Sequence, residues 1–117
     1  MNSKRLVNLI ELSSNVKFYV PTTANVDQTI DTSAYVEKVE KLFSEWFGGA
    51  TQYSALGCWQ SPAVGLVKES IIIVESFCNE KALQENIEKV VDLAEEVKHF
   101  LTQESIAIEI NNKLYLV

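Results

Sequence analysis

The residues best suited to chemistry lie close to one turn in the middle of the chain. The flat indole of Trp59 offers a stacking surface, and the polar side chains of Gln60, Lys68 and Glu69 are suited to holding the edges of a ligand. Gly57 carries no side chain and leaves room above Glu69. These five residues predict a pocket for a small, planar, polar ligand such as a nucleotide. In the alternative interpretation, Trp59 packs against helices and Gly57 relieves a crowded or bulged strand.

A catalytic interpretation starts from Glu69, whose place inside an expected hairpin suits a carboxylate to proton transfer. A second catalytic group is not evident. The single histidine, His99, lies near the end of an expected helix, a position typical of a solvated side chain. Cys58 and Cys78 do not have the spacing of zinc ligands, and two cysteines alone do not make a disulfide framework. We therefore expect no catalytic residue, no metal and no cofactor.

A β-hairpin is expected to position the pocket residues. Residues 51–60 and 66–77 have the composition of strands, and the turn-rich segment 61–65 joins them. The register matters because a slip of one residue moves every side chain to the other face of the sheet. The expected pairs are Tyr53 with Ile73, Ala55 with Ile71, Gly57 with Glu69, Trp59 with Val67 and Gln60 with Leu66.

Two amphipathic helices are expected to cover the hairpin and its neighbours. Apolar residues recur at three- and four-residue spacing over residues 33–47 and again over 80–101. Gly48 and Gly49 end the first helix, and Asn79 caps the second.

Shorter strands are expected outside these elements. Alternating apolar residues predict strands over 16–20 and 106–110, and a tight turn at Asn111-Asn112 leads to a last strand at 113–117. Residues 21–31 are expected to form a polar loop. Residues 1–14 fit a short helix or a strand, and the choice stays open.

The order of these elements predicts an α+β fold, a ferredoxin-like βαββαβ sandwich over a single domain spanning residues 1–117. Two helices would pack on one face of an antiparallel sheet, and a short C-terminal strand would extend it. The run Ile71-Ile72-Ile73-Val74 is apolar on both sides of its strand. That pattern predicts a partner on the second face, most simply a second copy of the chain in a homodimer.

The charge of the chain restricts its partners. The net charge is −6, so a broad electrostatic contact with nucleic acid is not expected. Asp92, Glu95 and Glu96 lie on the outer face of the second long helix, which is either a solvated surface or a docking site for a basic protein. The longest apolar run has four residues, too few to cross a membrane, and a cytoplasmic protein is the simplest expectation.

Residues 46–110 resemble a bacterial family of small ferredoxin-like domains of unknown function. The resemblance covers somewhat more than half of the chain, and it implies the fold more than any activity. It also implies a setting in phages or other mobile elements. The matching segments are Phe47-Gly48-Gly49-Ala50-Thr51, Gly57-Cys58-Trp59, Gly65-Leu66-Val67-Lys68-Glu69 and Gln103-Glu104-Ser105-Ile106.

The sequence favours a small non-enzymatic binding module that binds or sequesters a small polar or nucleotide-like ligand near Trp59 and Glu69. The first alternative is an acidic interaction or inhibitor protein that docks on a basic partner. The second is a cofactor-free enzyme built on a dimeric ferredoxin-like barrel.

Overall fold

The computed structural model describes residues 3–24, 28–29 and 31–117. Its elements, in chain order, are α1 (Lys4–Val7), β1 (Ser14–Pro21), β2 (Thr23–Ala24), β3 (Gln28–Thr29), α2 (Ser33–Phe47), β4 (Thr51–Ser61), β5 (Gly65–Cys78), α3 (Glu80–Phe100), β6 (Ala107–Ile110) and β7 (Lys113–Leu116). Five strands form one sheet in the order β4-β5-β1-β6-β7, and each pairs antiparallel with its neighbours. The expected α+β class is confirmed.

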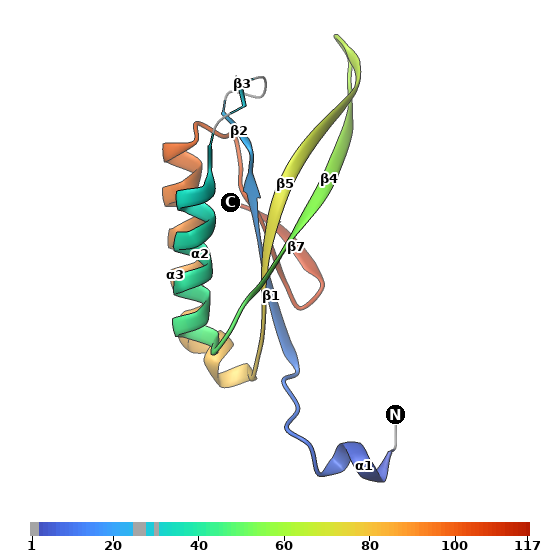
Figure 1. Cartoon of the computed structure of the whole chain (residues 1–117), viewed down its shortest axis with the longest axis vertical. Helices are drawn as coiled ribbons and strands as arrows, with labels where there is room; N and C mark the ends of the chain where they lie inside the picture. Colours follow the sequence, from blue (N-terminus) through green and yellow to red (C-terminus); the bar gives the residue numbers. More distant parts are fainter. Residues whose placement is uncertain (1–2, 25–27, 30) are drawn as a thin grey trace.

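Helices α2 and α3 lie side by side on one face of this sheet (Figure 1). The amphipathic pattern explains their position, because the buried residues of each helix lie on its sheet-facing stripe. Helix α2 ends at Gly48, whose φ of 91° favours glycine, and the side chain of Asn79 accepts a hydrogen bond from the Ala82 N–H at 2.8 Å to cap α3. Both helix boundaries agree with those expected.

The core lies between the helices and β1, β5 and β6. Phe18 of β1 is fully buried and meets the ring of Phe43 of α2 edge to face, with centroids 6.1 Å apart. This pair anchors the helical layer to the sheet. The largest fully buried side chains are Phe18, Phe43, Ile106, Ile108, Val16, Val20, Val39, Val74, Val90 and Val97.

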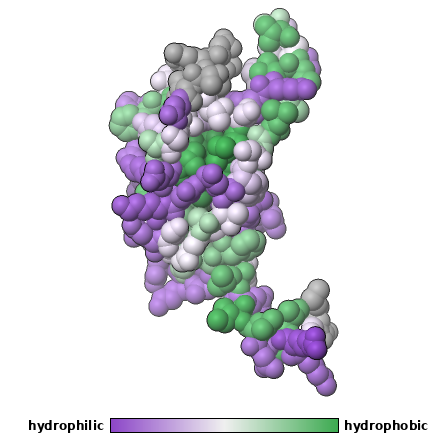
Figure 2. All heavy atoms as spheres, viewed as in Figure 1, coloured by the Kyte–Doolittle hydropathy of each residue, from purple (hydrophilic) through white to green (hydrophobic). Residues whose placement is uncertain are grey.

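The hairpin of β4 and β5 has the expected register, including Gly57 opposite Glu69 and Trp59 opposite Val67. The hairpin extends past α2 and α3, and its turn end projects well beyond these helices (Figure 1). Leu56, Val64 and Leu66 are exposed near this end, which forms one of the hydrophobic areas in Figure 2.

The N-terminal part of the chain has a short helix, α1, which lies away from the rest of the molecule (Figure 1). Strand β1 begins at Ser14, two residues earlier than expected, because Ser14 and Asn15 still pair with β5. Within the expected loop 21–31, β2 and β3 form a separate two-stranded pair, and residues 25–27 and 30 lie outside the described residues. No helix in the described part of the chain has the length and apolar character needed to cross a membrane.

Candidate functional site

The register of the sheet decides which side chains share a face. Phe18, Val20 and Val74 are buried under the helices, so the alternate residues of each strand lie on the other face, here called the open face. Side chains alternate between the two faces along a strand, and Glu69 lies an odd number of residues, five, from Val74 on β5. Glu69 therefore belongs to the open face. Gly57 pairs with Glu69, and Trp59 lies two residues farther along β4. Three of the expected pocket residues therefore share one face.

A hollow of about 160 Å³ lies beside Glu69 on this face. It forms where the end of β1, the middle of β5 and the segment leading into β6 meet. Its lining residues are Tyr19, Pro21, Glu69, Ile71, Gln103, Ser105, Ile106 and Ala107. Sites for small molecules have volumes of about 300–1,000 Å³. A nucleoside-sized ligand would therefore fill this hollow and extend over the neighbouring strand surface.

That neighbouring surface leads toward Trp59. The indole is 46% exposed and does not line the hollow, so it is neither buried by the helices nor part of the depression itself. Gly57 lies between the two, and a Cβ there would come 3.7 Å from the Glu69 carbonyl oxygen, an ordinary van der Waals contact. Because residue 57 is glycine, no side chain projects from this position of β4 between the indole and the hollow. The indole and the hollow are therefore separate features of one face, and we treat them together as the candidate site.

Gln60 and Lys68 lie on the opposite face of the hairpin from Trp59 and Glu69. Lys68 pairs with Cys58, and Gln60 pairs with Leu66, so both alternate with the open-face residues. Their side chains are exposed on the side of the sheet that carries the helices. The structure does not bring these two residues together with the other three.

A polar network borders the site on β1 and β6. The Tyr19 hydroxyl donates a hydrogen bond to Glu109 Oε1 at 3.0 Å, and Lys17 Nζ lies 3.5 Å from Glu109 Oε2. Burial raises the pKa of Tyr19 above its usual range, and the hydrogen bond to Glu109 adds to this effect. Tyr19 is thereby held as a neutral hydrogen-bond donor at one side of the hollow.

We expect the folding stability that depends on Tyr19 to be present below about pH 10 and to be lost as the pH rises through its raised pKa, because the folded state disfavours the phenolate. An alkaline titration that follows tyrosinate absorbance should contain one late phase. Tyr19→Phe should remove that phase, and Tyr115→Phe, an exposed tyrosine outside the network, should leave it in place. Loss of the late phase in the Tyr115 variant instead would contradict the assignment.

Sequence reasoning missed Tyr19, Gln103 and Ser105 as site residues. Gln103 and Ser105 belong to a segment that supported the family resemblance, and this was the available signal. Tyr19 is brought to the site by the pairing of β1 with β5, in which it lies opposite Ile73. The alternation of apolar residues within β1 does not by itself indicate which residues of β5 lie opposite them.

The expected acidic surface on α3 is not uniformly acidic. Glu96 is paired with Lys38 of α2 at 2.5 Å. Asp92 and Glu96 also line a hollow of about 290 Å³ together with Lys38 and Lys89. Glu95 is exposed to solvent.

The other residues considered for chemistry lie apart from the open-face site. His99 is exposed and packs its ring against Phe100, with centroids 5.6 Å apart. Cys58 is exposed and Cys78 is buried, and burial raises the pKa of the Cys78 thiol. Across residues 3–24, 28–29 and 31–117, no group of three or more His, Cys, Asp or Glu side chains is arranged to hold a metal ion.

The fold is shared with solved structures of a phage enzyme. A phage SAM lyase in complex with S-methyl-5′-thioadenosine aligns over 94% of this chain and 92% of its own, with a TM-score of 0.66 and 18% sequence identity. A phage SAM lyase in the apo state aligns over 94% and 95%, with a TM-score of 0.63 and 18% identity. No family model matches the chain. No curated protein matches it either.

This likeness corrects the functional expectation drawn from the sequence. A non-enzymatic binding module was expected because no second catalytic group accompanied Glu69. The alternative, an acidic inhibitor protein, was expected from the net negative charge and the acidic face of the second long helix. The two solved structures reported above are those of an enzyme, and one of them holds S-methyl-5′-thioadenosine. These two structures contradict the expectation of a protein without enzymatic activity.

Proposed function

We propose that this chain is a lyase that cleaves S-adenosylmethionine, or a closely related sulfonium nucleoside, and releases S-methyl-5′-thioadenosine. The observation that carries the proposal is the likeness over nearly the whole chain to a phage SAM lyase that holds this nucleoside. The open face supports it with residues whose chemistry suits such a substrate. At 18% identity the activity itself stays a proposal.

The substrate has two parts that the site can distinguish. Its adenine is flat and aromatic, and the half-exposed indole of Trp59 offers a face for stacking. Its sulfonium is a cation, and the Glu69 carboxylate lies on the same face, one diagonal pair along the strands. A nucleoside that stacks on Trp59 across Gly57 would direct its sulfonium toward Glu69.

The reaction breaks the bond between the sulfonium sulfur and the γ-carbon of the amino-acid chain. The bonding electron pair moves to sulfur, which leaves as a neutral thioether in S-methyl-5′-thioadenosine. Without added water, the four-carbon fragment is completed by loss of a β-proton to a base or by closure of its own carboxylate onto the γ-carbon. In this proposal Glu69 acts as that base in the first route and holds the cation in the second.

We also propose that the fold is ferredoxin-like. Strands β1, β4, β5 and β6 with helices α2 and α3 follow the order βαββαβ. The order β4-β5-β1-β6 within the sheet supports a ferredoxin-like arrangement, with β7 added at the edge. Membership of the bacterial family that residues 46–110 resemble stays a prediction.

Homodimerisation through the open face also stays a prediction. Ile73 was one reason for it, but this side chain is only 6% exposed in the single chain. Tyr19 and Tyr53 are its partners on the two neighbouring strands. Exposed apolar residues on this face remain at its two edges, including Trp59 and Leu116.

The test is direct incubation of the purified protein with S-adenosylmethionine, followed by chromatography of the nucleoside products. We expect S-methyl-5′-thioadenosine to accumulate faster than in buffer alone and faster than with heat-denatured protein. Release of S-adenosylhomocysteine would indicate methyl transfer instead and would contradict the proposal. Intact substrate after prolonged incubation would also contradict it.

A further inference from the structure

Strand β4 forms one edge of the five-stranded sheet, and β7 forms the other. The two edges differ in length, since β4 has 11 residues and β7 has 4. One side of β4 pairs with β5, and no described strand pairs with its other side. The backbone N–H and C=O groups along this outer side therefore present the hydrogen-bonding pattern of a strand without a neighbour.

Proteins normally protect such an edge by means that β4 lacks. Exposed edge strands are usually short, or they carry charged residues, proline or a β-bulge that hinders pairing with another chain. Residues 51–61 contain no Asp, Glu, Lys, Arg or Pro, and their register with β5 runs without a bulge from Thr51 to Ser61. Strand β7 has this protection, because it is short and begins with Lys113. The edge of β4 is therefore suited to pairing with a further strand.

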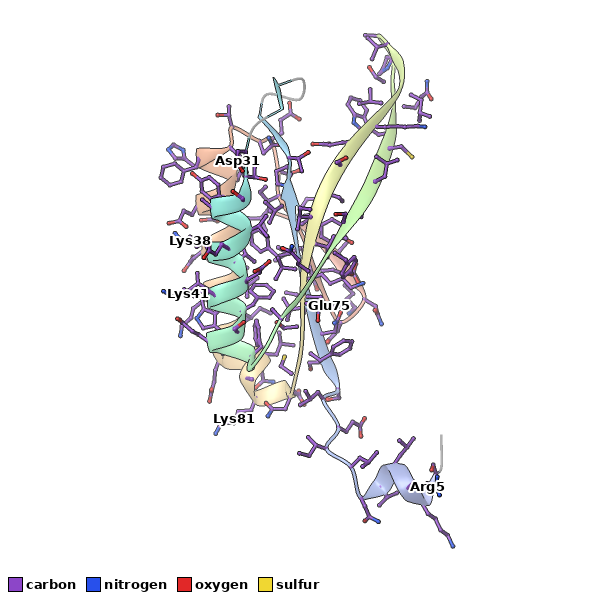
Figure 3. All side chains as sticks on the ribbon, viewed as in Figure 1. Arg5, Asp31, Lys38, Lys41, Glu75 and Lys81 are labelled. Atoms are coloured by element: carbon purple, nitrogen blue, oxygen red, sulfur yellow. The ribbon has the colours of Figure 1, made fainter. Side chains whose placement is uncertain are left out.

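The turn end of the hairpin lacks support from the strands of its own chain. Strand β1 pairs with β5 only as far as Ile71, whereas β4 and β5 pair with each other as far as Ser61 and Gly65. From Ile71 to the turn, the described residues thus form a two-stranded ribbon, and Figure 3 shows the side chains of its tip apart from those of the helices. An isolated two-stranded hairpin is at best marginally stable in water, and further strands stabilise it.

The charge of the chain favours a second copy as the source of the further strand. With a net charge of −6, two copies repel each other over much of their surfaces. The uncharged edge of β4 lets two copies approach without placing like charges opposite each other, whereas the adjoining part of β5 carries Lys68 and Glu69. The edge is also self-complementary, because two antiparallel strands related by a twofold axis exchange backbone donors and acceptors equally.

Pairing over the full length of β4 is centred on Leu56, the middle residue of the strand. In that register, Leu56 lies opposite the partner's Leu56, and Trp59 lies opposite the partner's Tyr53. All three side chains are exposed in the single chain. Apolar and aromatic pairs directly opposite each other stabilise antiparallel strands, so this register gives the exposed side chains of β4 matching neighbours.

We propose that two copies of this chain associate through the edges of their β4 strands, antiparallel about a twofold axis at Leu56, so that the two hairpins form one four-stranded ribbon. An axis perpendicular to the sheet keeps the helices of both copies on one side and joins the two open faces into one surface. This interface differs from the homodimer expected from the sequence, which would cover the open face. The proposal does not rest on the lyase activity, and its tests measure association without substrate.

The first test is sedimentation equilibrium of the wild-type chain over a series of concentrations in reducing buffer. We expect a reversible dimer. Leu56→Lys should weaken the dimer by at least about tenfold, because it places two ammonium groups opposite each other at the twofold axis. Leu56→Glu should weaken it similarly with two carboxylates. An equimolar mixture of the two variants should restore the dimer, since each ammonium group then lies opposite a carboxylate.

The matched control is Leu114→Lys on the other edge of the sheet, which should dimerise as the wild type does. Leu56 is 64% exposed and Leu114 is 57% exposed, so both substitutions should leave the fold intact, and circular dichroism checks this. A wild-type chain that stays monomeric, or a mixture of the Leu56 variants that fails to dimerise, would overturn the proposal. An assembly of three copies would also overturn it, because pairing through β4 closes at two.

A disulfide tests the register. In the proposed pairing, Ser54 lies opposite the partner's Cys58, and Cys58 is exposed in the single chain. Opposed residues of antiparallel strands have Cα atoms about 4.5 or 5.5 Å apart, a separation that a disulfide can span. Under mild oxidation, Ser54→Cys should therefore form a covalent dimer. The wild type and the double variant Ser54→Cys/Cys58→Ser should not, because neither places two thiols opposite each other. Equal crosslinking of all three chains, or none in Ser54→Cys, would exclude the register centred on Leu56.

Discussion

Glu69→Gln is expected to reduce the release of S-methyl-5′-thioadenosine from S-adenosylmethionine by about 100-fold or more. Glutamine keeps the size and much of the hydrogen-bonding capacity of glutamate but removes both its negative charge and its ability to take a proton. A positioned general base contributes about 10²- to 10⁴-fold to a rate. Loss of the carboxylate also removes the group that faces the sulfonium in the proposed arrangement. The measurement is the initial rate of nucleoside release at saturating substrate.

The control for this variant is Glu88→Gln, which makes the same change on the exposed side of α3. It should retain the wild-type rate. Thermal unfolding should show that both variants fold, so that lost activity reports on the site. If Glu69→Gln kept more than about a third of the wild-type rate while folding normally, Glu69 would have no role in the chemical step, and the proposed site would have to be abandoned.

Much of the arrangement around Glu69 could be predicted from local sequence patterns. The turn at residues 61–65 fixes the register of β4 and β5, and this register correctly places Gly57 opposite Glu69. Alternation then puts Trp59 on the same face as Glu69. The same alternation puts Gln60 and Lys68 on the opposite face. The expected pocket included these two residues because they lie close to the turn in sequence, and closeness in sequence does not decide the face.

The remainder of the site depends on contacts between distant parts of the chain. Tyr19 reaches the hollow because β1 pairs with β5, and Gln103 and Ser105 reach it because the segment after α3 leads into β6 beside β1. These pairings join residues more than 50 positions apart, and no local periodicity encodes them.

Trp59→Ala is expected to weaken the binding of S-methyl-5′-thioadenosine by about 5- to 150-fold. This range corresponds to the roughly 1–3 kcal/mol that stacking of a base on an aromatic side chain contributes. Because Trp59 is 46% exposed and lies outside the core, the substitution should change the free energy of unfolding little. Isothermal titration with the nucleoside measures the affinity directly. An unchanged affinity would mean that the adenine lies elsewhere on the open face.

The second tryptophan makes a fluorescence version of this test selective. Trp46 is half-buried against the core and contacts Phe43 and Phe47, so Trp46→Phe leaves Trp59 as the single indole emitter. Addition of S-methyl-5′-thioadenosine should quench the emission of that variant, because the adenine would stack on the remaining indole. The complementary variant Trp59→Phe retains only Trp46, which the ligand does not reach in the proposed arrangement, and its emission should stay constant. Quenching in Trp59→Phe with none in Trp46→Phe would place the nucleoside near α2 and would separate the binding site from Glu69.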